Sequence, residues 1–291
     1  MSKNLILYAY RGDENELSIK NLEFFVNNGI IEDENIVYLI IVNGNNKPSV
    51  RINENKNLKV LLYKNYGHGW GSWEYGLKNV NINEYKYFFF IKDTARGPFL
   101  DLPKNWVSIF TNKINDKVKL VGPSINLKCN TYNYNDNKIL KFEPHVQSFF
   151  FVTDRYGLDL MNLHNIFNKD FSSKISNKRE VVLSVKMFEQ DKEIESLIDN
   201  FEGINMSKLY KLKVKYNSNK RYILNTLLDN EMNYLSKDYY KHQYFSNPNP
   251  YEVIFCKTVC PKKIIDKLNK LGGKLSNKKK KIRKLTKKKR R

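Results

Sequence analysis

Short apolar runs alternate with segments of helical periodicity through the first half of the chain. Runs typical of buried strands occupy residues 5–10, 36–42, 58–62, 87–91 and 117–122. Between them, apolar residues recur at helical spacing over residues 17–28, 73–80 and 106–111. Strands that are apolar along their whole length, separated by helices, are typical of a parallel sheet covered on both faces. We therefore predict an α/β fold with a mostly parallel central sheet and helices on both faces.

The pattern is less regular after residue 130. It predicts a polar, Asn-rich loop over residues 131–138, a strand over 147–153, a helix over 158–167 and a pair of helices over 180–197. The sequence Pro248-Asn249-Pro250 breaks the chain before a strand expected over residues 252–257, and a basic helix begins at Pro261. We expect a single domain over residues 1–260 and a flexible basic tail over residues 261–291.

Composition narrows the class of protein. The chain has 291 residues and is 41% hydrophobic, which is enough to bury a large core. No apolar run approaches the roughly 18–20 residues that cross a bilayer, and the segment before Arg11 is too short for a signal peptide. Three cysteines, Cys129, Cys256 and Cys260, are too few for a disulfide framework and are interpreted as reduced thiols. These features predict a soluble, cytoplasmic protein.

The positive charge is concentrated at the C-terminus. The formal net charge is +21, and about half of it comes from the Lys and Arg residues of the segment 278–291. Such a tail is suited to contact a polyanion or an anionic membrane surface, although a solvated tail explains the same composition. Most aromatic residues lie in apolar strand runs and are interpreted as core, so a folded nucleic-acid-binding surface is not favoured. We expect polyanion binding only as an accessory property of the tail.

The strand predicted over residues 87–91 runs directly into Asp93, Arg96 and Gly97-Pro98. Ligands of open parallel sheets bind at the carboxyl ends of the strands. An Asp at that edge can hold a divalent cation, and an Arg can make bidentate contacts to phosphate oxygens. An ordinary strand-to-turn junction explains the same residue types, so the local sequence leaves both interpretations open.

Three further segments carry residues suited to a binding site. A loop of alternate glycines from Asn65 and Gly67 to Trp73 joins a strand to a helix, without the spacing of a dinucleotide fingerprint. His145 and Gln147 come just before a predicted strand, and Glu180 is expected at the N-terminus of a helix. A flexible turn, a structural histidine and a helix-capping acid are the structural alternatives.

Taken in order, these segments resemble glycosyltransferases related to rhamnan-synthesis proteins, found in bacteria, algae, fungi and large DNA viruses. The likeness spans about residues 4–258. It rests on these motifs: Leu22-Glu23-Phe24-Phe25, Asn43-Gly44, the loop from Asn65 to Trp73, Lys92-Asp93-Thr94-Ala95-Arg96-Gly97-Pro98, Leu120-Val121-Gly122, His145-Val146-Gln147-Ser148, Glu180 with Leu183-Ser184, and Pro250-Tyr251-Glu252.

The resemblance implies a GT-A-like fold, with a nucleotide-binding half of about residues 1–125 and an acceptor-side half of about 126–260. It also implies transfer of a hexosyl or deoxyhexosyl group from a nucleotide-diphospho-sugar donor to a hydroxyl of a glycan or glycoprotein acceptor. Glu180 would act as the general base, His145 and Gln147 would orient sugar hydroxyls, and a divalent cation, manganese or magnesium, would bind Asp93. The expected donor contacts are Tyr8, Asn65, Gly67, Asp93, Arg96 and Gln147.

Three residues depart from the family's pattern. Ala95 stands where a full Asp-x-Asp motif has its second carboxylate, Gly69 stands where related enzymes often carry Asp, and Lys92 replaces a common Asn. These departures weaken the expectation of strict metal dependence. They also leave an alternative open, in which a catalytically degenerate transferase fold only binds glycans or polyanions.

Overall fold

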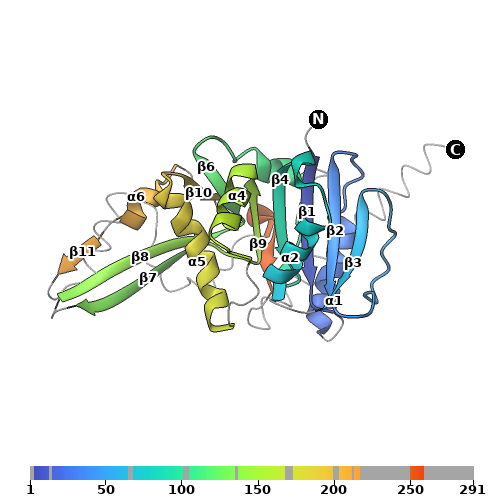
Figure 1. The fold of residues 1–291 in the computed structure, drawn as a ribbon, viewed down its shortest axis with the longest axis horizontal. Helices are drawn as coiled ribbons and strands as arrows, with labels where there is room; N and C mark the ends of the chain where they lie inside the picture. The colour runs from blue at the N-terminus through green and yellow to red at the C-terminus, as the bar shows by residue number, and fades with distance from the viewer. Residues whose placement is uncertain are drawn as a thin grey trace.

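A seven-stranded sheet forms the centre of the molecule (Figure 1). The computed structural model describes residues 3–12, 15–64, 68–100, 105–134, 137–167, 173–198, 203–211, 213–216 and 250–258. In spatial order the strands are β10 (Glu193–Ser196), β6 (Val118–Gly122), β9 (Phe150–Asp154), β4 (Tyr85–Lys92), β1 (Lys3–Tyr10), β2 (Ile36–Asn43) and β3 (Leu58–Tyr63). All neighbouring strands are parallel except β9, which runs antiparallel to β4 and β6. The prediction of a mostly parallel α/β sheet with helices on both faces is confirmed.

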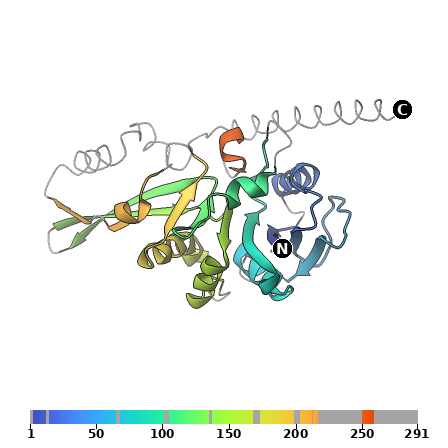
Figure 2. The same cartoon turned by 90° about the horizontal axis from the view of Figure 1, so that it is seen from above.

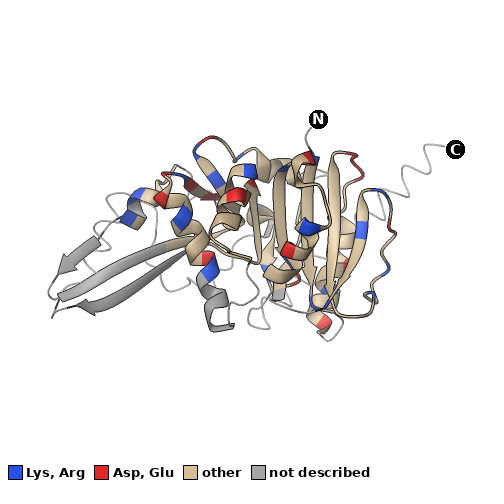
Figure 3. Ribbon diagram, viewed as in Figure 1, with Lys and Arg blue, Asp and Glu red and all other residues tan. Residues whose placement is uncertain are grey.

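Helices cover the sheet on both faces (Figure 2). One face carries α1 (Glu16–Asn28), α3 (Trp106–Thr111) and α9 (Pro250–Val253), and the other carries α2 (His68–Lys78), α4 (Arg155–Leu163) and α5 (Ser173–Glu189). Every residue of β2 is buried, as its unbroken apolar sequence predicts. Charged side chains gather on helices, loops and strand ends, while the middle of the sheet is almost free of charge (Figure 3).

Helix α1 begins and ends as its sequence predicts. The Asn15 side chain caps the first turn by accepting a hydrogen bond from the Leu17 amide at 2.9 Å. The Gly29 amide donates to the Phe25 carbonyl at 2.6 Å and closes the last turn. The buried side of α1, which includes Asn21 and Phe25, packs toward the strands, so this helix reaches the carboxyl ends of β1 and β4.

A long hairpin extends from one side of the sheet where the sequence predicts a loop. Strands β7 (Ile125–Tyr134) and β8 (Asn137–Val146) pair antiparallel over their whole length, and β11 (Lys213–Tyr216) adds to β8. Short helix α6 (Met206–Lys211) lies against β8 (Figure 1). The loop prediction over residues 131–138 is therefore wrong, because pairing between the strands, and not local propensity, decides their conformation.

Two other predicted elements differ from the structure. Residues 180–197 are the second half of α5 followed by strand β10, and not a pair of helices. The strand expected over residues 252–257 is the short helix α9 followed by β12 (Cys256–Lys257), which pairs with β5 (Ala95–Arg96) directly after β4. This last pairing brings the end of the described chain to the carboxyl edge of the sheet.

No helix within the described ranges has both the length and the apolar character needed to cross a bilayer. A short 3₁₀ turn over Ile82–Glu84 leads into β4. The basic segment 261–291, with the polyanion contact expected of it, lies outside the described residues.

Candidate functional site

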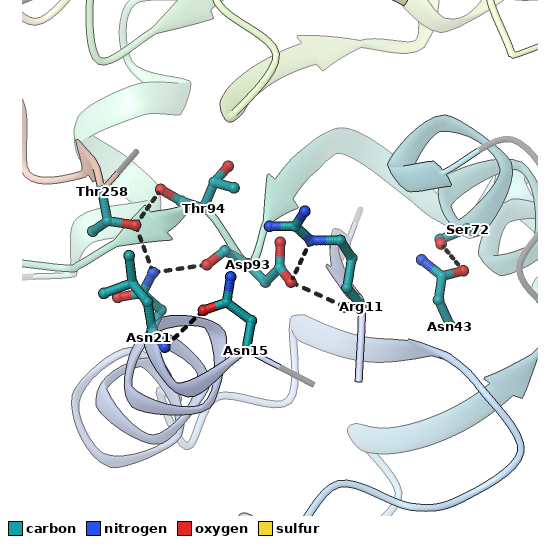
Figure 4. A network of polar contacts seen from close by, with 9 residues as sticks. Arg11, Asn15, Asn21, Asn43, Ser72, Asp93, Thr94 and Thr258 are labelled. Atoms are coloured by element: carbon teal, nitrogen blue, oxygen red, sulfur yellow. Dashed lines mark hydrogen bonds and ion pairs between the residues drawn. The ribbon is translucent and has the colours of Figure 1, made fainter. Parts of the chain in front are cut away.

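The carboxyl ends of β1 and β4 meet at Asp93. Ala9 of β1 pairs with Lys92 of β4, and the Asp93 amide donates to the Ala9 carbonyl at 3.0 Å. The Asp93 carboxylate, only 4% exposed, accepts hydrogen bonds at one oxygen from the Arg11 amide (3.1 Å) and from Arg11 Nε (3.3 Å). The Arg11 side chain is 50% exposed. A buried carboxylate thus fixes a guanidinium whose outer part faces solvent (Figure 4).

A bridge of side chains holds the turn after β4 from the side of α1. Asn21 Nδ2 donates to the Asp93 carbonyl at 2.7 Å and to the Thr258 hydroxyl at 2.8 Å (Figure 4). The Thr258 hydroxyl donates in turn to the Thr94 carbonyl at 2.9 Å. These contacts therefore hold the turn after β4 from two sides, from α1 and from the chain after β12.

Tyr8 and Arg96 lie under α1 beside this turn. Arg96 is buried, with its guanidinium carbon 5.2 Å from the centre of the Phe24 ring. Tyr8 is also buried, and among the described residues its hydroxyl has no hydrogen-bond partner. Burial raises the pKa of Tyr8 well above its usual value, and the nearby charge of Asp93 raises it further, while Arg96 lowers it. The phenol is therefore neutral and keeps its proton as a donor.

A second group of polar side chains forms a chain from β4 to α5. Lys92 Nζ donates to Ser148 Oγ at 2.6 Å, and Ser148 Oγ donates a short hydrogen bond to Glu180 Oε1. Glu180 Oε2 lies 3.9 Å from His145 Nε2. The Glu180 side chain is 17% exposed. Lys92, the neighbour of Asp93, therefore connects the turn at the end of β4 with the Glu180 carboxylate.

Two indoles of α2 hold the cations of this second group. Lys92 Nζ lies 5.4 Å from the centre of the Trp70 ring and 5.3 Å from that of Trp73. The guanidinium carbon of Arg179 lies 5.8 Å from the Trp70 ring. Ring faces attract cations, so these contacts stabilise positive charge in a partly desolvated place. Burial lowers the pKa of Lys92 to about 8; Glu180 and Asp93 oppose this shift, and Lys257 and Arg179 add to it.

Positive side chains gather around the carboxyl end of β4. Among the described residues they are Arg11, Lys92, Arg96, Arg179 and Lys257, and the carboxylates of Asp93, Glu180 and Glu23 lie beside them. The guanidinium of Arg11 is half exposed. This edge of the sheet is therefore suited to an anionic ligand such as a diphosphate.

The structure brings most of the sequence-predicted site residues together. Tyr8, Asp93 and Arg96 lie on the α1 side of the turn, and His145 and Glu180 lie near each other on the far side of Lys92. Glu180 is in the middle of α5, so the expectation that it opens a helix is wrong. Gln147 is partly exposed, and its carbonyl accepts from the Phe150 amide at 3.4 Å. Asn65 and Gly67 lie outside the described residues.

Sequence reasoning missed three members of the site. Arg11 contacts Asp93 from 82 positions away, and Ser148 bridges Lys92 and Glu180 across 56 and 32 positions. No local sequence feature at Arg11 or Ser148 predicts these contacts. Lys92 left a local signal, because a lysine directly after the apolar run of residues 87–91 is unusual.

A divalent cation at Asp93 does not fit the described residues. No three His, Cys, Asp or Glu side chains within them gather closely enough to hold a metal ion. Asp93 offers one carboxylate that already accepts two hydrogen bonds from Arg11, and buried Ala95 has no ligand atom to add. Magnesium is usually held by one or two carboxylates together with waters and phosphate oxygens, and the charges of Lys92 and Arg11 beside this single carboxylate repel it.

Comparisons with known proteins find likeness in structure only. No family model and no curated protein matches the sequence, so membership in the rhamnan-synthesis-related family stays a prediction. Similar solved structures include a 4-diphosphocytidyl-2C-methyl-D-erythritol synthase from Anaerococcus prevotii, with 9% identity, TM-score 0.39, and coverage of 67% of this chain and 86% of that one. The catalytic domain of Drosophila β1,4-galactosyltransferase 7, in complex with xylobiose, has 10% identity, TM-score 0.35 and coverage of 68% and 66%.

A third similar structure is the inositol-1-phosphate CTP transferase from T. maritima, with 14% identity, TM-score 0.34 and coverage of 67% of this chain and 84% of that one. These neighbours are nucleotidyl- and glycosyltransferases. With TM-scores below 0.4 and identities of 14% or less, these similarities carry no argument about function. The chemistry of this chain has to be argued from its own side chains.

Proposed function

We propose that this chain transfers a sugar from a nucleotide-diphospho-sugar donor to a hydroxyl group of a glycan or glycoprotein acceptor. One observation carries the proposal: the half-exposed guanidinium of Arg11, fixed by the buried Asp93 carboxylate, lies where β1 and β4 end. A guanidinium is suited to bind phosphate oxygens, and the carboxyl edge of a parallel sheet is where α/β folds bind such ligands. The resemblance to glycosyltransferases in sequence motifs agrees with this chemistry.

On the donor side, the half-exposed guanidinium of Arg11 is the group suited to bind phosphate oxygens. Asp93 accepts from Arg11 Nε and so orients the rest of the fork toward solvent. Asp93 then acts as a positioning residue. Arg96 is covered by Phe24 and buried, so it contributes positive charge from below the turn and does not contact the donor directly.

On the acceptor side, Glu180 is the group suited to act as general base. Its carboxylate is held by Ser148 and lies close to His145, and part of it reaches solvent. The acceptor oxygen forms a bond to the anomeric carbon while the bond from that carbon to the donor's phosphate oxygen breaks. The acceptor proton passes to Glu180, and the bonding electrons leave with the nucleoside diphosphate.

A thermal-shift screen tests this function. UDP, GDP, ADP, CDP and dTDP and their common sugar conjugates are added to the full chain, and at least one is expected to raise the melting temperature. Binding at about 100 times the dissociation constant adds about 2.7 kcal/mol to the free energy of unfolding. If no nucleotide in the panel shifts the melting temperature, the proposal is wrong.

Matched arginine variants locate the binding. Arg11→Ala removes a guanidinium that pairs with an Asp at the site, and we expect most of the nucleotide-induced shift to disappear. Arg155→Ala removes an equally exposed guanidinium that pairs with Asp159 on α4, and the shift is expected to remain. Equal shifts in the two variants contradict a donor site at Arg11.

A further inference from the structure

Lys92 and Gly69 occupy complementary space at the start of α2. A Cβ atom added to Gly69 would lie 3.0 Å from Lys92 Cε and 3.3 Å from Lys92 Cγ. The Lys92 stem therefore fills the volume that a side chain at position 69 would take. A side chain at position 69 would therefore displace the Lys92 stem from its observed place.

The Lys92 ammonium has N–H groups from which no described residue accepts a hydrogen bond. An ammonium carries three N–H groups, and among the described residues only Ser148 Oγ accepts a hydrogen bond from Lys92. Trp70 and Trp73 hold its charge through their ring faces, which offer no further acceptor. Part of the residue is exposed to solvent, and two of the three N–H groups of its ammonium have no acceptor among the described residues.

The charges around Asp93 also disfavour a divalent cation. Its carboxylate is already neutralised by Arg11 at 3.3 Å, and the neighbouring cations Lys92 and Arg96 leave no local excess of negative charge. Positive side chains beside a single carboxylate repel a divalent cation, so they disfavour one at Asp93.

We infer that the ammonium of Lys92, together with the guanidinium of Arg11, takes the place of a divalent cation at this site and binds the donor diphosphate directly. This inference rests on the proposed function and names the groups that perform its charge neutralisation. Lys92 becomes a donor-binding residue that stabilises the leaving nucleoside diphosphate electrostatically. Diphosphate binding, and the transfer that depends on it, then proceed in the presence of a metal chelator.

Calorimetric titration of nucleoside diphosphates tests the inference. UDP, GDP, ADP, CDP and dTDP are titrated into the full chain, once in EDTA and once with manganese. We expect at least one to bind in EDTA, with a dissociation constant within about threefold of that with manganese. Binding that appears only with manganese overturns the inference and leaves the proposed function standing. Absence of binding in both buffers overturns both.

Two lysine variants sharpen the test. Lys92→Met keeps an apolar stem against the indoles and removes the ammonium, and the dissociation constant in EDTA is expected to rise about tenfold or more. Lys119→Met is the control, because it removes an ammonium near the amino end of β6 that lies 2.7 Å from Asp154 Oδ2 and 5.6 Å from the centre of the Tyr156 ring. The dissociation constant of the nucleoside diphosphate from this variant should change less than about twofold. Native-like affinity in a folded Lys92→Met variant overturns the inference.

Discussion

Asn21, near the start of the chain, and Thr258, at the end of its described part, share a hydrogen bond of 2.8 Å beneath the site turn. The same Asn21 amide nitrogen donates to the Asp93 carbonyl at 2.7 Å. One buried side chain therefore ties α1 to both the turn after β4 and the segment after β12. The position of Asp93, and through it that of Arg11, depends on this contact.

Replacing Asn21 with Ala removes both hydrogen bonds and leaves the Asp93 carbonyl without this buried donor. We expect the free energy of unfolding to fall by about 1–3 kcal/mol, as measured by urea denaturation. Asn28→Ala is the matched control on the same helix, because its side chain donates only to the Phe24 carbonyl in a partly buried place. A loss in Asn21→Ala no larger than in Asn28→Ala shows that the bridge does not hold the turn.

Gly69→Ala displaces Lys92 without removing its charge. The new Cβ would lie 3.0 Å from Lys92 Cε, so the flexible stem has to shift by a few tenths of an ångström. We expect affinity for nucleoside diphosphate to fall about two- to fivefold, while helix α2 keeps or gains stability. In the Lys92→Met background the same change should have no further effect on affinity.

Gly44→Ala is the control, because a Cβ there meets nothing within 4 Å. Additive losses in the double variant, or an equal loss in Gly44→Ala, contradict the coupling between Gly69 and Lys92.

Stability should depend on pH through Lys92. Burial lowers its pKa from 10.5 to about 8, so between these values the unfolded chain binds more protons than the folded chain. The destabilisation by Lys92 is therefore full below pH 8 and disappears as the pH rises toward 10.5. Lys92→Met should be more stable than the native chain at pH 7, by about 1–3 kcal/mol after allowance for partial exposure.

Urea denaturation of both proteins at pH 7 and at pH 10 measures this difference. The gap between their free energies of unfolding should narrow at the higher pH. A difference that stays constant or widens between pH 7 and pH 10 would show that the Lys92 ammonium is not desolvated in the folded protein.

Glu180→Gln keeps the acceptor for Ser148 and removes the base. We expect kcat for sugar transfer to fall by about 10²–10⁴-fold, with donor affinity changed little. Glu189→Gln, on the same helix, removes an exposed carboxylate that pairs with Lys186 and should leave kcat unchanged. A kcat of Glu180→Gln close to that of Glu189→Gln rules out Glu180 as the base.

The sequence predicts the sheet well because its signals are local. Apolar runs such as residues 36–42 and the capped helix before Gly29 carry their conformation in their own residues. The sequence does not predict the β7–β8 hairpin, because its Asn- and Lys-rich strands have a weak propensity for β structure and form by pairing with each other. The sequence also predicts a helix where β10 lies, because this strand forms by pairing with β6, which is distant in the sequence.

The candidate site is predictable only in part. Short motifs point to Asp93, His145 and Glu180, because carboxylates and imidazoles at strand and helix boundaries are common in active sites. The role of Arg11 depends on the approach of β1 to β4, and no pattern in the sequence encodes that distance. The role of Lys92 is likewise visible only in the structure, because it depends on contacts with the Trp70 and Trp73 rings and on the absence of a side chain at Gly69.

Turnover of a nucleotide-sugar panel tests the central claim most directly, with release of nucleoside diphosphate as the readout. The native chain should release it from at least one donor, Asp93→Asn should be at least about tenfold slower because Arg11 loses its charged partner, and Asp154→Asn, which breaks the ion pair with Lys119, should remain active. If no donor turns over, or if Asp93→Asn is as active as Asp154→Asn, the account of a transferase site at the end of β4 is contradicted.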